Sequence, residues 1–206
     1  MCVSQCSKCV GYTLVPLAII CMLANALLLF PDFQTKYLLD GHITSEARMS
    51  SGIWASGVLV LVAARVFVSS ASKKGCCGFR AAMMCQVGYT CVALAAAGFC
   101  LLTCGKGLLM GPHCLYNGTH GPEWGTPLRP TSISAPRSEG LYISQPDRWA
   151  STCIEPRRVV LWNVTLFIVV MAASGIQVLL CAVNIINSLL GVVCGPSFGI
   201  NKVTPA

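Results

Sequence analysis

Fourteen cysteines dominate the reactive side chains of this sequence, and five of them lie just outside long apolar stretches. Cys2, Cys6 and Cys9 precede the first apolar stretch, and Cys76 and Cys77 lie in a short basic segment. Cysteines beside a membrane span are common sites of reversible S-acylation. The spacing of Cys6 and Cys9 also resembles half of a zinc site, but the adjacent pair Cys76-Cys77 is a poor second half. The pattern therefore favours acylation at these positions, with structural packing and metal binding as the alternatives.

The other reactive side chains do not form a catalytic pattern. The histidines, His42, His113 and His120, lack the spacing of metal ligands, and neither an HExxH motif nor a glycine-rich phosphate loop is present. His120 could pair with Ser132 or Cys114, but no third group is placed to orient such a pair. The sequence therefore predicts a protein that is not an enzyme and holds no metal or cofactor.

Among the polar side chains within the apolar stretches, four are candidates for a functional role: Arg65, Lys106, Gln177 and Asn184. Polar groups inside a membrane span are costly and often mark function. Arg65 and Lys106 lie near the ends of their stretches, where a long side chain can reach the membrane surface. They can therefore snorkel or pair within a helix bundle, and the alternative is an ion or ligand site. No acidic residue lies in the apolar stretches, which argues against proton- or cation-coupled transport.

Four apolar stretches carry these side chains, at 10–30, 53–71, 81–110 and 159–194. A helix needs about 20 apolar residues to cross a bilayer, so we expect spans at about 10–30, 53–71, 86–110 and 159–182. The first is longer than the 7–15 apolar residues of a secretory signal and should be retained. The sequence predicts an all-α integral membrane protein: one four-helix transmembrane domain over residues 1–206, embedded in a lipid bilayer.

The overall composition points the same way. Of 206 residues, 55% are hydrophobic and 10% charged, and the mean hydropathy is +0.70. An ordinary soluble domain has about 25% charged residues. The net charge of +7 is scattered along the chain, which argues against nucleic-acid binding.

The long connection, residues 111–158, indicates which side of the membrane each segment faces. It contains a glycosylation sequon at Asn117 and only two cysteines, Cys114 and Cys153, both features of an oxidising side. We therefore expect a large extracellular loop closed by a Cys114–Cys153 disulfide, a glycan on Asn117 and cytosolic termini. A second sequon, at Asn163, lies inside the fourth stretch and should stay unmodified.

Small side chains in the third stretch are expected to let the helices approach closely. Ala93 and Ala97, with Gly88 before them, would lie on one helix face.

Motifs along nearly the whole chain carry a family resemblance. They are the cysteines at 2, 6 and 9, ANALLLFP at 24–31, KGCCG at 74–78, GPHCL at 111–115, CIEP at 153–156, WNVTLF at 162–167 and INSLLG at 186–191. Together they resemble the L-six tumour-antigen family, a tetraspanin-like branch of the transmembrane-four proteins. Residues 120–145 do not match a family pattern.

The resemblance implies a membrane organiser or adaptor. Such a protein would associate in cis with integrins, receptors or other membrane proteins, including copies of itself, and modulate adhesion, migration or proliferation. It would reside in the plasma membrane, with endolysosomal membranes as the alternative. The residues themselves leave open a small-solute sensor or an auxiliary subunit of a transporter or pump, which would use Arg65, Lys106, Gln177 and Asn184.

Overall fold

The computed structural model describes residues 2–70, 76–118, 121–129, 143, 149, 152–156 and 158–194. Within them, four helical runs are long and apolar enough to cross a membrane: Ser4–Leu29, Ser45–Ser70, Arg80–Met110 and Val159–Val193. The predicted four-span helical membrane fold is therefore confirmed.

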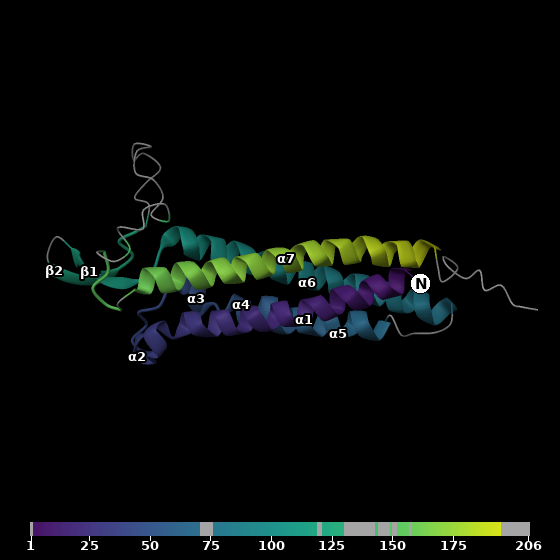
Figure 1. Cartoon of the computed structure of the whole chain (residues 1–206), viewed down its shortest axis with the longest axis horizontal. Helices are drawn as coiled ribbons and strands as arrows, with labels where there is room; N and C mark the ends of the chain where they lie inside the picture. The colour runs from purple at the N-terminus through teal and green to yellow at the C-terminus, as the bar shows by residue number, and fades with distance from the viewer. Residues whose placement is uncertain are drawn as a thin grey trace, which may run out of the picture.

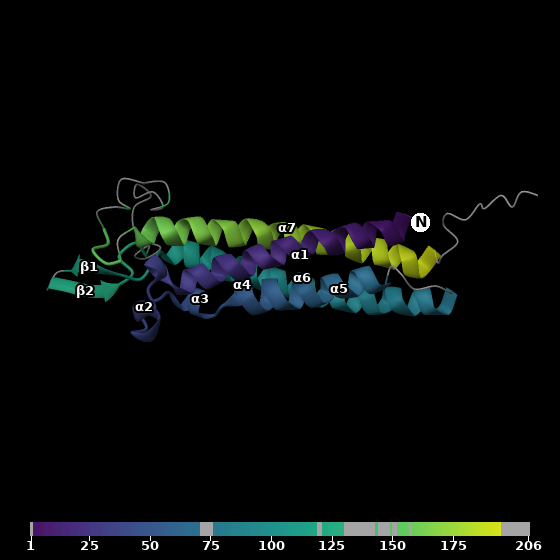
Figure 2. The ribbon, with the colours of Figure 1, turned by 60° about the horizontal axis from the view of Figure 1, so that its bottom comes forward.

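Three of the runs lie in single long helices, α1 (Cys2–Leu29), α6 (Cys76–Met110) and α7 (Val159–Cys194). α1 and α6 each pack against both α7 and α5 (Val60–Ser70), so α1 and α6 occupy opposite corners of the bundle. Figures 1 and 2 show the runs side by side along the long axis. A β-hairpin lies at one end, here called the hairpin end, and α1 begins at the other, here called the base.

The second run begins earlier than the sequence predicted. After the short helices η1 (Pro31–Phe33) and α2 (Lys36–Leu39), the run starts at α3 (Ser45–Arg48), eight residues before position 53. Glu46 therefore lies in the first helix of this run, before the span predicted at 53–71, and the predicted part of the run contains no acidic residue. The charge is tolerated because a lysine from α6 neutralises it.

The second run is also less regular than expected. α3 is followed by α4 (Ser51–Ile53), by a six-residue π-helical turn η2 (Trp54–Leu59), and only then by α5. π-Helical turns are rare and displace side chains from their normal helical positions. This turn lies where the second run faces α1 and α6.

The first and third helices extend past the predicted spans at the base. α1 starts at Cys2 and α6 at Cys76, so the cysteines predicted to precede each span lie on helices. Helix continuation keeps backbone groups hydrogen-bonded beyond the bilayer core, which hydropathy alone does not report.

Many small side chains lie inside the bundle beside a few large ones such as Phe67 and Leu14, and many large aliphatic side chains lie outside. Ala18, Ala63 and Ala93, from three different helices, are fully buried. Leu179 and Val193 on α7 are 68% and 76% exposed. Small residues allow close helix packing in membranes, and lipid covers the outward aliphatic groups. The exposure pattern therefore suits a bilayer and not water.

The cap at the hairpin end contains the only strands among the described residues. β1 (Cys114–Gly118) pairs antiparallel with β2 (Gly121–Gly125). On the other edge of β1, the backbone N–H of Leu115 donates to the carbonyl of Glu155 at 2.9 Å. This hairpin was not expected from a sequence read as all helical, because its two five-residue strands are too short to give a clear alternating pattern.

The predicted disulfide is confirmed. Cys114, at the start of β1, is bonded to Cys153, and their Cα atoms lie 5.7 Å apart. Both cysteines are buried against Val159, Val160 and Val164 of α7. The bond therefore fixes the cap to the first turns of the fourth span.

Candidate functional site

Near the base, a group of buried polar side chains joins all four runs; we call Ser7, Gln86, Thr90 and Asn184 the base layer. Gln86 Nε2 on α6 donates to Ser7 Oγ on α1 at 2.6 Å and to Asn184 Oδ1 on α7 at 3.0 Å. Asn184 Nδ2 donates in turn to Thr90 Oγ1 at 3.0 Å. Ser7 Oγ donates to the carbonyl of Phe67 on α5 at 3.4 Å. The hydrogen bonds of this layer therefore connect helices of all four runs.

Halfway along the bundle, a second group surrounds the π-helical turn; we call Cys21, Ser56, Ser174 and Gln177 the middle layer. Gln177 Nε2 donates to the backbone carbonyl of Ser56 at 3.0 Å, and Ser56 Oγ donates to Gln177 Oε1. Ser56 Oγ also lies 3.0 Å from Ser174 Oγ and 3.2 Å from Cys21 Sγ. The π-helical turn presents both the hydroxyl and the carbonyl of Ser56 to α7, which explains its position.

The four polar residues singled out from the sequence do not form one site. Gln177 and Asn184 are fully buried, in different layers. Arg65 lies on the exposed face of α5, and Lys106 lies at the hairpin end. The structure therefore does not assemble the solute site that the sequence left open.

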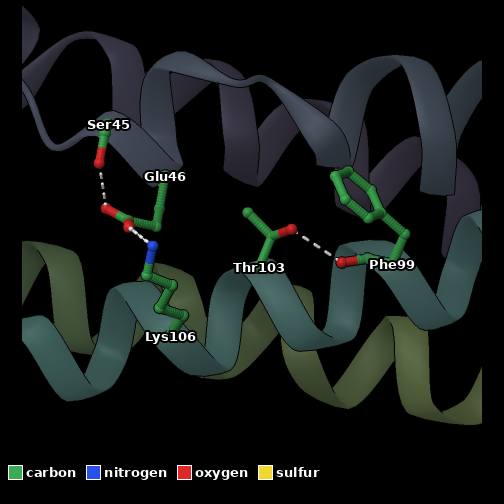
Figure 3. Close-up of polar contacts among 5 residues, drawn as sticks. All are labelled: Ser45, Glu46, Phe99, Thr103 and Lys106. Atoms are coloured by element: carbon green, nitrogen blue, oxygen red, sulfur yellow. Dashed lines mark hydrogen bonds and ion pairs between the residues drawn. The ribbon is translucent and has the colours of Figure 1, made fainter.

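Lys106 forms an ion pair at the hairpin end of α6. Its Nζ lies 3.3 Å from Glu46 Oε1 on α3, as Figure 3 shows, and Ser45 Oγ donates to the other carboxylate oxygen at 2.8 Å. One turn along α6, Thr103 donates to the carbonyl of Phe99 at 2.8 Å, so its hydroxyl is satisfied within its own helix (Figure 3). Of the two interpretations of Lys106, the structure shows pairing within the bundle.

Three rings stack in the cap above this ion pair. The ring centroids of Trp124, on β2, and His42 lie 3.8 Å apart, and the interplanar angle between the two rings is 7°. His113 lies nearly parallel to both, 6.0 Å from His42 and 6.2 Å from Trp124. Burial, reinforced by the nearby His42 ring, lowers the pKa of His113 below its ordinary value of 6.5. The neutral histidine is therefore the stable form within this stack.

The acylation candidates differ in what the structure shows of them. Cys9 is exposed on α1, whereas Cys6 is partly buried against the core at the base. The side chains of Cys2, Cys76 and Cys77 lie outside the described residues. Their acylation stays a prediction.

Two more cysteines on α6, Cys85 and Cys91, are also exposed. Hydropathy gives no sign of which helix face turns inward, so the exposure of these two thiols could not be predicted from the sequence.

The two sequons have different surroundings. Asn117 is exposed on β1. Asn163 is buried in α7, and its Nδ2 donates to the carbonyl of Val159 at 3.1 Å. Glycosylation of Asn117 stays a prediction.

Two of the three small residues expected to permit close packing do so. Ala93 and Ala97 are fully buried, but Gly88 is exposed, and no atom lies within 4 Å of the position its Cβ would take. One close approach is instead at Gly52, where a Cβ would lie 2.7 Å from Asn25 Cβ and 3.0 Å from the carbonyl oxygen of Cys21 on α1.

Within the described residues, no group of three or more His, Cys, Asp or Glu side chains could hold a metal ion. The polar clusters here join helices, and none of them presents a nucleophile, base and orienting group together.

Comparison with known proteins gives a consistent result. The family model described as L6 membrane protein matches residues 1–198. The chain is 36% identical over 202 residues to Transmembrane 4 L6 family member 1 from Homo sapiens, with 95% of each chain covered. It is 38% identical over 200 residues to member 5 from Bos taurus, again with 95% of each covered. It is 37% identical over 204 residues to member 4 from Mus musculus, covering 95% of this chain and 93% of the relative. No solved structure matches the chain. Sequence motifs, four apolar helices and whole-length similarity agree, and the chain belongs to the L6 membrane protein family.

Proposed function

We propose that this protein is a membrane organiser that associates in cis with other membrane proteins and thereby modulates adhesion, migration or proliferation. The observation that carries the proposal is the division of its helix surfaces. Polar side chains lie inside and join the four runs, whereas large aliphatic side chains cover the outside. Because the polar side chains bond to one another inside the bundle, its outer surface is available to lipid and to the helices of partner proteins.

The outward face of α7 is one of these surfaces. Leu179, Ile186 and Leu190 are 68%, 62% and 53% exposed and recur at helical spacing. Integrins and receptors are proposed partners because family resemblance implies them. A second copy of the chain could use the same face.

The rest of the proposal concerns placement in the cell. We infer an orientation with cytosolic termini and an extracellular hairpin end, in the plasma membrane first and endolysosomal membranes second. The hairpin end holds the disulfide, and disulfides persist on oxidising sides of membranes. Acyl chains on cysteines at the base would strengthen association with ordered lipid, at about 0.8 kcal/mol per buried methylene.

Proximity labelling in living cells tests the proposal. Two variants are compared with the native chain: residues 120–145 replaced by a Gly/Ser segment of equal length, and the α7 face variant Leu179→Ala, Ile186→Ala, Leu190→Ala. Thr165→Val, which changes an exposed polar residue on α7, is the control. We expect a reproducible partner set that at least one variant loses and the control keeps. A partner set equal to that of an unrelated four-span protein would overturn the proposal.

A further inference from the structure

A cavity of about 400 Å³ lies at the hairpin end, between the 41–44 segment, α3, the end of α6 and the segment after β2. Its size falls in the range of small-molecule sites, about 300–1,000 Å³. Residues far apart in sequence meet around it, including Thr44, Arg48, Lys106, His113 and Arg129.

The charges around this cavity do not balance. Three basic side chains, Arg48, Lys106 and Arg129, line it with one carboxylate, Glu46. Both oxygens of Glu46 are engaged, one by Lys106 and the other by Ser45. Neither Arg48 nor Arg129 forms an ion pair with any described residue. Among the described residues, the guanidinium groups of Arg48 and Arg129 therefore line the cavity without a carboxylate partner.

Two buried polar atoms in the cavity wall also lack partners among the described residues. They are Thr44 Oγ1, on a side chain only 7% exposed, and His113 Nδ1. A buried polar group without a hydrogen bond costs about 1–3 kcal/mol. Native interiors leave few such groups, and both of these belong to residues that line the cavity.

We propose that this cavity binds an oxyanion, the carboxylate or phosphate group of a small solute or of a lipid headgroup. Arg48 and Arg129 contact the anionic oxygens, because the planar guanidinium fork matches carboxylate and phosphate. The Thr44 hydroxyl donates a hydrogen bond to the same group. The inference does not depend on the organiser role, since it concerns a single copy of the chain.

Both sources of the oxyanion are compatible with the position of the cavity. It adjoins Lys106 and Met110, the last turns of a candidate span, and so lies where a bilayer meets water. A dissolved anion enters from the aqueous side, and a headgroup enters from the outer leaflet. The two sources need separate experimental arms.

The solute arm uses the full chain in phosphatidylcholine nanodiscs, titrated calorimetrically with succinate and with inorganic phosphate at constant ionic strength. We expect saturable binding that Arg48→Gln/Arg129→Gln weakens about tenfold or more. Thr44→Val should weaken it several-fold. Arg65→Gln removes an exposed arginine outside the cavity and is the matched control, with unchanged binding.

The lipid arm measures phosphatidylglycerol retained on the detergent-purified protein by native mass spectrometry, with phosphatidylcholine as reference. Retention that falls in the double arginine variant but not in Arg65→Gln assigns the site to a headgroup. Circular dichroism and an intact disulfide show that the variants are folded. If neither arm depends on Arg48 and Arg129, the proposal is wrong.

Discussion

His113 is the side chain of the cap whose protonation matters most. Its pKa is lowered by burial and by His42, so the folded state binds fewer protons than the unfolded chain near pH 6. The stability that this histidine contributes is present above its ordinary value of 6.5 and is lost as the pH falls through the lowered folded value. Acidification should therefore loosen the ring stack.

The measurement is the thermal unfolding temperature of the purified protein between about pH 7.5 and 5.5. We expect the native chain to lose more stability over this range than His113→Gln, which cannot be protonated. Parallel pH profiles for the two proteins would contradict this expectation.

The disulfide gives a second prediction at the scale of single residues. Replacing Cys114 and Cys153 together by serine reopens a loop with a sequence separation of 39. In the chain-entropy model, closing this loop stabilises the folded state by about 4 kcal/mol. Amide hydrogen exchange in β1 and β2 should therefore accelerate by between about tenfold and a thousandfold. Exchange in the middle of α6 should not change.

Cys9→Ser removes an exposed thiol on α1 and is the control for this experiment. Hairpin exchange as slow in the double variant as in the control would show that packing against α7 holds the cap without the bond.

Sequence reasoning at this scale identified residues better than their partners. The disulfide was predictable because only two cysteines share the long connection. Gln177 and Asn184 were recognisable as amides in apolar helices. Their partners, Ser56 and Gln86, were not, because partner choice depends on the rotation of each helix about its axis, which one chain's hydropathy does not define.

The middle layer yields a prediction about how helices are joined. Gln177→Leu keeps the side-chain size but removes the hydrogen bonds of Gln177 to the carbonyl and hydroxyl of Ser56, leaving the hydroxyl only Ser174 on α7. Hydrogen bonds between membrane helices contribute about 0.6 kcal/mol on average and about 1.7 at most. We expect a loss of about 1–3 kcal/mol in the free energy of unfolding.

Helicity followed by circular dichroism during titration with sodium dodecyl sulfate measures this loss. Thr165→Val also removes a polar group from α7, at an exposed position, and should be neutral. Equal midpoints for the two variants would mean that the middle layer does not stabilise the bundle.

The contact between α1 and α4 depends on the absence of a side chain at one position. At Gly52 an added Cβ would lie 2.7 Å from Asn25 Cβ and 3.0 Å from the carbonyl oxygen of Cys21. Gly52→Ala should therefore destabilise the bundle by about 1–3 kcal/mol. Gly175→Ala is the matched control, because nothing lies within 4 Å of its added Cβ. In a helix interior that change should be neutral or stabilising by up to about 1 kcal/mol.

The same detergent titration should show a lower midpoint for Gly52→Ala and an unchanged or higher midpoint for Gly175→Ala. A stable Gly52→Ala protein would show that α1 and the second run can separate without loss.

At the scale of elements, hydropathy predicted the four helices but not where they end. The second run begins at α3, where Glu46 pairs with Lys106, sixty positions along the chain. Hydropathy averaged over a short stretch of sequence does not report a partner that lies so far along the chain. The hairpin was missed for a related reason, since β1 is held on its second edge by Glu155, which follows it by forty residues.

At the scale of the whole molecule, the hairpin end and the base differ in the chemistry they present. The hairpin end has the disulfide, the ring stack and an exposed sequon, whereas the base has exposed Cys9 and the polar layer that joins the helices. A membrane keeps these two environments apart. The proposed orientation follows from that asymmetry and can be tested with the two sequons together.

In mammalian cells we expect one endoglycosidase-sensitive form, carrying a glycan on Asn117, because this side chain is exposed on β1 beyond the end of the bundle (Figures 1 and 2). Asn117→Gln should abolish the gel shift. Asn163→Gln should leave it unchanged, since Asn163 is only 6% exposed and bonded within α7. Protease treatment of sealed, right-side-out vesicles should cut the long connection in the non-glycosylated Asn117→Gln variant as well. Protection of that connection would place the hairpin end in the cytosol, where a Cys114–Cys153 bond would not persist.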